Sequence, residues 1–287
     1  MSLYAYRHVF SNERTCFWLL HRLRWSEGPL CPRCGSQSYW RMMEHGRPEY
    51  RCRVCRYHYS LLTGTELEGT RLPLTKWVLA AGLFAIGISS HGLAREIQVS
   101  QRIAWKMLTK FRQALQANQI LRKLAGSVEV DETYIGGRAK GKRGRGAAHK
   151  SIVLGMRTRK GRVRSLVLLT LRTRDMQKIL QSQIVKGSRL FTDHYYVYGR
   201  VRRWGFRHRR IEHAKRFVRG KTHTQGIEGY WGHLKPTLTA RHRSVSPKHL
   251  QGYLAEADVK HNMGLDADFT ALVMQQLLSH RRGLPSK

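Results

Sequence analysis

Apolar residues recur every three or four positions from residue 73 to about residue 121, which predicts helices. Within this stretch, the segment GLAREIQVSQRIAWKML predicts two helices joined by a turn at residues 98–100, with Ser100 capping the second helix. The recurring apolar positions include Leu93, Ile97, Ile103, Met107 and Leu108. This is the order of a helix-turn-helix, and either DNA contact or helix packing alone explains it.

From residue 127 onward the apolar period changes to that of strands. Strands are expected at residues 127–135, 151–158, 163–171 and 188–193, with a helix at residues 174–185. A later helix is expected to run from Thr224 until Pro236, and others over residues 248–262 and 269–278. Three strands, a helix, a fourth strand and further helices is the order of an RNase H-like α/β domain, although other mixed α/β folds share parts of it.

The charge of the chain is strongly unbalanced. It has 53 Lys and Arg but 18 Asp and Glu, a formal net charge of +35 and a pI near 11.0. The basic residues run from Arg7 to Lys287, among 7 Trp and 12 Tyr, in a chain that is 41% hydrophobic and therefore able to form a core. Contact with nucleic acid phosphates is the natural interpretation, and a basic soluble protein of ribosomal type is the alternative.

The N-terminal sequence lacks the apolar core of a signal peptide, and the longest apolar run, residues 77–88, is too short to span a bilayer. Four of the five cysteines form two CxxC pairs, which suit metal binding in a reducing compartment. These observations predict a soluble cytoplasmic protein, associated with the nucleoid and without a membrane partner. The lone Cys16 is predicted to be a small buried apolar residue.

The two CxxC pairs are separated by seventeen residues, the spacing with which two β-turns offer four thiolates to a tetrahedral Zn²⁺ ion. The predicted ligands are Cys31, Cys34, Cys52 and Cys55. A site of four cysteines has no open coordination position, so one structural ion is expected to stabilise a small zinc ribbon without performing catalysis. Five arginines near the pairs are placed to meet phosphates: Arg33, Arg41, Arg51, Arg53 and Arg56.

Acidic residues are scarce, so carboxylates in apolar surroundings stand out, because an unpaired buried charge is costly. Asp131 lies in the first expected strand of the α/β region, Asp193 ends the fourth, and Glu228 lies on the helix that begins near Thr224. Asp131 and Glu132 point to opposite faces of their strand, so both cannot face one site. Three carboxylates from two strands and a helix are what two Mg²⁺ ions need for phosphoryl transfer, although each acid alone could equally pair with an arginine.

Several motifs in the same order resemble those of one known family. The runs VEVDETYIGG, FTDHYYVYG and HTQGIEGYWGHLK look like the DDE domain of bacterial insertion-sequence transposases. The specific resemblance is to the ISXO-type branch, which carries an N-terminal CxxC zinc ribbon. The likeness continues in TRLPLTKW, GISSHGLAREIQVS and SPKHLQGYLAEADVKHN, and it covers roughly residues 14–265.

The resemblance implies a role for each matching residue. Asp131, Asp193 and Glu228 correspond to the family's catalytic triad, which holds two Mg²⁺ (or Mn²⁺) ions, with 34 residues between the last two acids. Lys235 matches a basic residue seven positions after the glutamate, on the same helical face, where it can meet a DNA phosphate. The chain departs from the family at Gln225, where asparagine is usual. A longer amide at this position, three residues before the glutamate, still lies beside it on the helix.

The expected organisation is a zinc ribbon with an N-terminal segment (residues 1–72), a helix-turn-helix segment (73–122), an RNase H-like catalytic domain (123–265) and a C-terminal helix with a basic tail (266–287). The last segment either supports dimerisation or covers the core. The basic stretches 138–150 and 200–219 are expected to hold DNA backbone near the metals.

The implied function is that of a DNA transposase that binds terminal inverted repeats and target DNA, cleaves DNA and transfers strands with Mg²⁺. Two ends must be brought together, so a homodimer or larger assembly on double-stranded DNA is expected. The alternatives are a domesticated, catalytically silent DNA-binding protein, a structure-specific nuclease on the same fold, and a tyrosine recombinase that uses Tyr195, Tyr196 or Tyr198.

Overall fold

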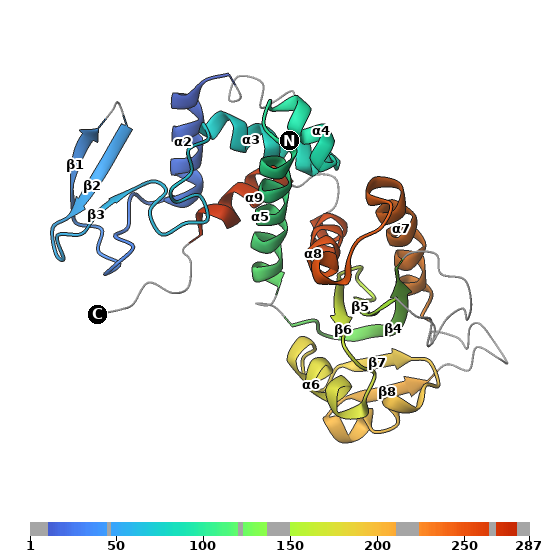
Figure 1. Cartoon of the computed structure of the whole chain (residues 1–287). Coiled ribbons are helices and arrows are strands. Elements are labelled where there is room, and N and C mark those ends of the chain that lie inside the picture. The colour runs from blue at the N-terminus through green and yellow to red at the C-terminus, as the bar shows by residue number, and fades with distance from the viewer. Residues whose placement is uncertain are drawn as a thin grey trace. The chain divides into compact units, whose positions relative to one another are not determined.

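A computed structural model describes residues 11–44, 47–119, 123–136, 150–210, 224–263 and 268–279 (Figure 1). The chain forms two compact units, one of Met1–Ala114 with Leu265–Lys287 and the other of Leu115–Gly264. Most of the basic loop at residues 138–150, and the part of the basic stretch 200–219 beyond residue 210, lie outside the described residues.

The ribbon of the first unit is a sheet of three antiparallel strands, β1 (Tyr39–Glu44), β2 (Arg47–Cys52) and β3 (His58–Ser60), in the order β1-β2-β3. Its buried side carries an aromatic cluster in which the ring of Tyr50 lies 5.5 Å from the rings of both Trp25 and Tyr59. Trp25 follows helix α2 (Glu13–Arg24), so α2 and the strands bury aromatic surface together.

Helix α2 also organises the helices that follow. The Glu13 carboxylate accepts hydrogen bonds from the backbone N–H groups of Leu74 and Thr75, at 3.0 and 3.2 Å, and so caps α3 (Leu74–Ile86), which starts after Pro73 and has no cap of its own. Helix α9 (Phe269–Leu278) packs against α2 and α3 and buries Val273, Met274, Leu277 and Leu278. In the structure, the C-terminal helix therefore covers the core of the first unit.

The two helices expected from GLAREIQVSQRIAWKML are α4 (Ser90–Glu96) and α5 (Gln101–Gln119). Gln98 makes the turn between them with a φ of 50°, and the Ser100 hydroxyl accepts the backbone N–H of Ile103 at 3.3 Å, as an N-cap does. Leu93, Ile97, Met107 and Leu108 are buried, but Ile103 is 38% exposed. The apolar period thus identified both helices and misplaced one position of their core face.

The second unit is built on a five-stranded sheet with the order β6-β5-β4-β7-β8. Strands β4 (Ser127–Ile135), β5 (Ser151–Thr158) and β6 (Val163–Leu168) are antiparallel, and after helix α6 (Thr173–Gln183) strand β7 (Arg189–Thr192) pairs parallel to β4. This is the RNase H-like topology that the sequence predicted. The fifth strand, β8 (Arg207–Arg210), was not expected, because it is basic and buries only His208.

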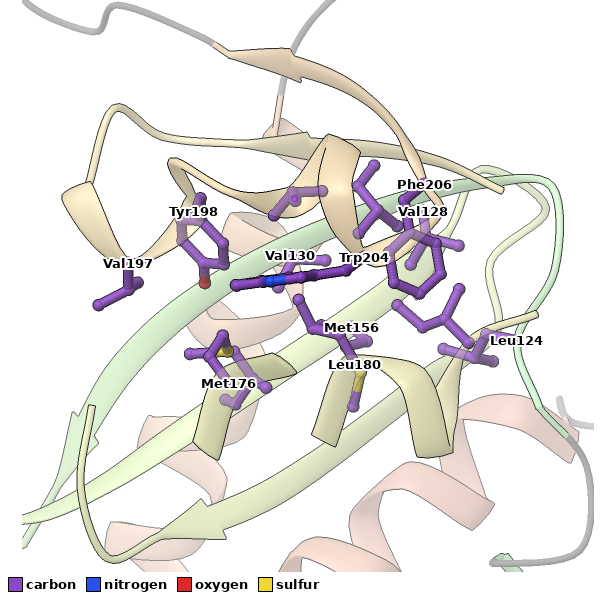
Figure 2. Packing of buried hydrophobic residues seen from close by; sticks show 14 of the residues in the cluster. Leu124, Val128, Val130, Met156, Met176, Leu180, Val197, Tyr198, Trp204 and Phe206 are labelled. Carbon is purple, nitrogen blue, oxygen red and sulfur yellow. The ribbon is translucent and has the colours of Figure 1, made fainter. Parts of the chain in front are cut away.

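Each face of this sheet has its own core. On one face, Val128 and Val130 pack with Met176 and Leu180 of α6 and with Trp204 from the short 3₁₀ segment Val201–Trp204, as Figure 2 shows. On the other face lie helices α7 (Gln225–His242) and α8 (Pro247–Met263). Their core residues include Ile227, Trp231, Leu234, Leu238, Leu250 and Leu254. The α/β/α sandwich places β4, the central strand, between two packed layers.

Helix α7 corrects the expectation that Pro236 ends it. The helix continues for six residues to His242, although proline lacks the N–H for one helical hydrogen bond. Leu234 and Leu238 are both buried on either side of Pro236, while Pro236 itself is exposed. Packing of the apolar face against the sheet therefore outweighs the local cost of the proline.

Helix α8 covers the outer edge of the sheet with polar side chains. The Asn262 side chain donates to the Val163 carbonyl and accepts the Val163 N–H. The Gln251 side chain donates to the Ser165 carbonyl and accepts the Val167 N–H. Fully buried Asp258 accepts the N–H and the hydroxyl of Ser165, and burial raises the pKa of its carboxyl to about 6. This edge strand is thus closed to pairing with another chain.

Candidate active site

Strand β4 presents an acidic face toward α7. Because side chains alternate along a strand, Val128 and Val130 enter the core on the α6 side, and Glu129 and Asp131 lie on the opposite face. The Asp131 carboxylate accepts a hydrogen bond from the indole Nε1 of Trp231, a residue of α7, at 3.1 Å. Asp131 is therefore held between its own strand and the helix.

Asp193 follows β7 directly. The parallel register pairs Glu129 with Phe191, so two residues further on Asp193 lies level with Asp131. Its carboxylate accepts the backbone N–H of Tyr195 at 2.9 Å, an Asx-turn that ends the strand and fixes the side chain. Both aspartates thus lie at neighbouring positions on adjacent strands.

Glu228 lies in the first turn of α7, where the helix dipole favours a negative charge. The Thr224 hydroxyl donates to its carboxylate at 2.7 Å. The residues on either side of it anchor the helix to β4, since Ile227 donates its backbone N–H to Glu129 at 2.9 Å and Trp231 donates to Asp131. These anchors hold Glu228, which is exposed, over the acidic face of β4.

The pKa of Asp131 depends on its burial and on the charges around it, including those of the other two acids. The pKa of Asp131 is raised from its ordinary value to about 6, chiefly because the carboxyl is buried, and also because Asp193 and Glu228 are negatively charged. The bond from Trp231 opposes this rise. In the described part of the chain, the carboxylate oxygens of these three acids do not all lie within 4.8 Å of one another.

Glu129 is a buried acid whose role sequence reasoning did not assign. Its side chain is fully buried, accepts the backbone N–H of Ile227, and pairs with the Arg159 guanidinium, with Nε 3.1 Å from Oε1. The signal was available, because Glu129 is in phase with Asp131 on the strand. Its bond to the start of α7 makes it a structural anchor for the helix that carries Glu228.

Two glycines allow this close approach of helix and sheet. A Cβ atom at Gly226 would lie 2.1 Å from the Arg157 guanidinium and 2.7 Å from a carboxylate oxygen of Glu129. A Cβ atom at Gly155, which pairs with Asp131 across the sheet, would lie 2.2 Å from the Trp231 indole. Space at these positions is what lets Trp231 reach Asp131.

We expect Gly155→Ala to destabilise the second unit by about 1–3 kcal/mol, the usual cost of overpacking a core, and to displace Trp231 from Asp131. Chemical denaturation monitored by tryptophan fluorescence measures this loss. Gly229→Ala is the matched control, because a Cβ atom there meets nothing within 4 Å and alanine favours the helix. Equal stability of the two variants would contradict the role assigned to Gly155.

The remaining residues suggested by the sequence occupy distinct positions on α7. Lys235 is an exposed residue two helical turns after Glu228. Partial burial of its ammonium group lowers its pKa, and the negative charge of Asp131 opposes that shift. Gln225 is the exposed first residue of the helix. A Cβ atom at Gly232 would meet nothing within 4 Å, so steric fit does not require glycine there.

The tyrosines near Asp193 differ in their access to solvent. Tyr198 is fully buried and donates its hydroxyl to Glu132, and its pKa is raised well above the ordinary value, first by burial and then by the Glu132 charge. Glu132 thus faces away from Asp131, as strand alternation predicted. Tyr196 is 70% exposed. A buried, hydrogen-bonded Tyr198 is unsuited to act as a nucleophile.

The four ribbon cysteines form a second site. Their sulfur atoms all lie within 4.8 Å of one another, with Cys31–Cys55 and Cys34–Cys52 Sγ distances of 3.5 Å. Tetrahedral Zn²⁺ with bonds of about 2.3 Å would hold sulfurs about 3.8 Å apart, so the donor set fits this ion. Cys16 is fully buried elsewhere, and its thiol pKa is raised to about 12, chiefly by burial. It behaves as the buried apolar residue that was expected.

Arginines of the ribbon stack on aromatic rings. The guanidinium carbons of Arg53 and Arg56 lie 5.5 and 4.7 Å from the ring centre of Trp40, which is 38% exposed, and that of Arg41 lies 5.8 Å from the ring of Trp18. All three arginines are exposed. The ribbon and its aromatic rings therefore hold several positive charges on an ordered surface.

Comparison with known proteins identifies two domains in this chain. Residues 11–58 match a transposase zinc-ribbon domain, and residues 123–262 match an ISXO2-like transposase domain. An uncharacterized protein in transposable element ISH50 of Halobacterium salinarum is 32% identical over 136 residues, which are 47% of this chain and 46% of the relative. The chain therefore aligns with about half the length of this curated relative.

Solved structures show slighter likenesses. The catalytic core domain of BIV integrase gives a TM-score of 0.32 at 14% identity, over 46% of this chain and 82% of that one. The Mos1 transposase in a pre-cleavage transpososome gives 0.30 at 11% identity, over 71% and 75%. Such scores add nothing to what the strand order already shows.

Among the described helices, none combines the length and the apolar character that crossing a membrane requires.

The two matched domains follow each other in the expected order and together cover about two thirds of the chain. They coincide with the four-cysteine ribbon and with the α/β region that contains the three acids. The chain therefore belongs to the family of transposases that combine a transposase zinc-ribbon domain with an ISXO2-like transposase domain.

Proposed function

We propose that this chain is the transposase of an insertion sequence and that Asp131, Asp193 and Glu228 hold two divalent cations, normally Mg²⁺, at its active site. The observation that carries the proposal is the convergence of the three carboxylates from β4, the end of β7 and the first turn of α7. Carboxylate oxygens supplied by separate elements in this way are the ligands that hard divalent cations prefer.

The donor set suits hard cations, because it consists of carboxylate oxygens; burial raises the pKa of Asp131, and the charges of Asp193 and Glu228 add to that rise. Bound there, the ions would stabilise negative charge on the attacking and leaving oxygens of a phosphodiester. The chain's own residues position this site. Trp231 orients Asp131, Thr224 orients Glu228, and Lys235 offers a positive charge for a phosphate beside Asp131.

The reaction would be two successive displacements at phosphorus. Water first attacks the phosphodiester at the end of the element and leaves a 3′-hydroxyl and a 5′-phosphate. The freed 3′-hydroxyl then attacks a phosphodiester of target DNA, forms a new bond and displaces a target 3′-hydroxyl. Neither step needs a covalent bond between protein and DNA.

DNA recognition would be divided between the ribbon and the helix-turn-helix. The ribbon offers exposed arginines, and α5 exposes Gln101, Arg102 and Lys106 on its first turns, the part of a recognition helix that enters the major groove. Together they would recognise the terminal inverted repeats. Joining two ends further implies two or more copies of the chain on DNA.

The test is a cleavage and joining assay with duplexes that carry the ends of the element next to the gene. We expect nicking that leaves a 3′-hydroxyl, and joining to a target duplex, with Mg²⁺ or Mn²⁺ but not in buffer that lacks both ions. Binding without cleavage under all metal conditions would instead favour a silent DNA-binding protein. Cleavage without joining would favour a nuclease, and activity in buffer that lacks both ions would contradict the metal mechanism.

A further inference from the structure

A cavity lies at the C-terminal end of β4 and along the second half of α7. Its volume is about 280 Å³, large enough for a phosphate group. The end of β4 contributes Tyr134 and Ile135, and α7 contributes Lys235 and Thr239. Since Asp131 is on β4 and its charge acts on Lys235, the cavity adjoins the proposed active site.

The lining of the cavity is positively charged. Three cations contribute to it, namely Lys150 before β5, Lys235 on α7 and Arg243 at the end of α7. Among the described residues that line it, none is acidic, and Thr239 and Ser244 add hydroxyl groups. Lys150 and Lys235 are close enough that the charge of Lys150 helps to lower the pKa of Lys235. Like charges brought together in this way bind an anion favourably.

The backbone at Arg243 supplies an independent observation. Its φ and ψ are 54° and −64°, and the N–H of Ser244 donates to the carbonyl of His242 at 2.5 Å. This is a classic γ-turn, which is rare and strained for a residue with a side chain. Arg243 adopts it as the C-cap of α7 and lines the cavity. Strain of this kind is concentrated at ligand-binding and functional positions.

We propose that Lys150, Lys235 and Arg243 form a binding subsite for a DNA backbone phosphate next to the bond that is cut. This inference rests on the proposed function and extends it, because it assigns Lys150 and Arg243 to DNA positioning. The turn at Arg243 directs a guanidinium toward a phosphate while Lys235 and Lys150 bind from α7 and from the start of β5. A phosphate held here would fix the strand relative to Asp131.

The experiment measures binding of the full-length zinc-loaded protein to a random-sequence DNA duplex in buffer without Mg²⁺ or Mn²⁺, by fluorescence anisotropy over a series of KCl concentrations. Arg243→Asn removes the charge with a residue that tolerates positive φ. We expect affinity to fall roughly three- to ten-fold. We also expect the negative slope of log K against log salt to become shallower by about 0.9, the value for one lost phosphate contact. Lys150→Gln should give the same pattern.

The matched control is Arg241→Asn, which removes an exposed arginine two residues earlier on α7 that does not line this cavity. We expect it to leave the slope unchanged, and we expect Arg243→Lys to restore the slope lost in Arg243→Asn. Equal slopes for Arg243→Asn, Arg241→Asn and the unmodified protein would overturn the subsite. The subsite would also be overturned if Arg243→Asn reduced competition by free inorganic phosphate more than it reduced DNA binding. That result would identify a site for the free ion.

This test is independent of catalysis. If the protein cuts and joins element ends but Arg243→Asn binds DNA with an unchanged slope, only the subsite is wrong. If the slope decreases as expected but no cleavage or joining occurs with any metal, the subsite stands as a DNA contact and the proposed function fails.

Discussion

Replacing Asp131 by asparagine should abolish metal-dependent cleavage and joining while leaving DNA binding intact. Divalent ions supply several kcal/mol of charge stabilisation in phosphoryl transfer, and each 1.36 kcal/mol is tenfold in rate, so we expect a loss of about 10³-fold or more. Asp193→Asn and Glu228→Gln should have effects of the same order, since each removes one carboxylate from the same cluster. Initial rates of nicking of an element-end duplex measure the loss.

The control for this prediction is Glu27→Gln, which removes an exposed acid in the first unit and should leave the nicking rate unchanged. Misfolding can be separated from loss of chemistry. Burial disfavours the charged form of Asp131. Asparagine should therefore not lower the denaturation midpoint of the zinc-loaded protein measured without Mg²⁺. Full joining activity in any one of the three triad variants would refute the assignment.

Loss of zinc should unfold the ribbon. Structural zinc sites in small domains contribute about 10–16 kcal/mol of apparent binding free energy at neutral pH, and that energy is folding energy. We therefore expect Cys52→Ser to lose the single zinc ion and the order of the aromatic cluster around Tyr50. Zinc analysis of the purified protein and near-ultraviolet circular dichroism, which reports the packing of Trp25, Tyr50 and Tyr59, measure both effects.

Cys16→Ala is the matched control, because Cys16 is buried but is not part of the four-sulfur group. It should retain one zinc ion and the near-ultraviolet signal. A Cys52→Ser protein with a full complement of zinc and an unchanged spectrum would mean that the four cysteines do not form the metal site. DNA binding through the ribbon arginines should fall with the loss of zinc, because their platform is lost.

Local patterns were sufficient for much of the fold. The CxxC spacing identified the ribbon, whose sulfurs the structure places within 4.8 Å of one another. Apolar alternation identified β4, β5 and β6, and the three-to-four-residue period identified α4, α5 and α8. These elements carry their own signal, because turn geometry and side-chain periodicity act over a few residues.

Where tertiary packing overrides a local preference, the sequence was misleading. Strand β8 is basic and lacks alternation, yet it pairs with β7, whose free edge it completes. Helix α7 passes through Pro236 because Leu234 and Leu238 pack on the sheet on both sides of it. Neither outcome depends on the segment alone, so neither could be derived from its composition.

The sequence by itself determined the identity of the metal-binding cysteines as a group and singled out Asp131, Asp193 and Glu228 through their scarcity and family resemblance. Only the tertiary structure decided how the acids meet. The parallel register of β4 and β7 brings Asp193 level with Asp131, and contacts between β4 and α7 add Glu228. These contacts join residues about 60 to 100 positions apart, and they depend on space left by Gly155 and on buried Glu129. Such pairings are formed by packing between elements, which no local pattern encodes.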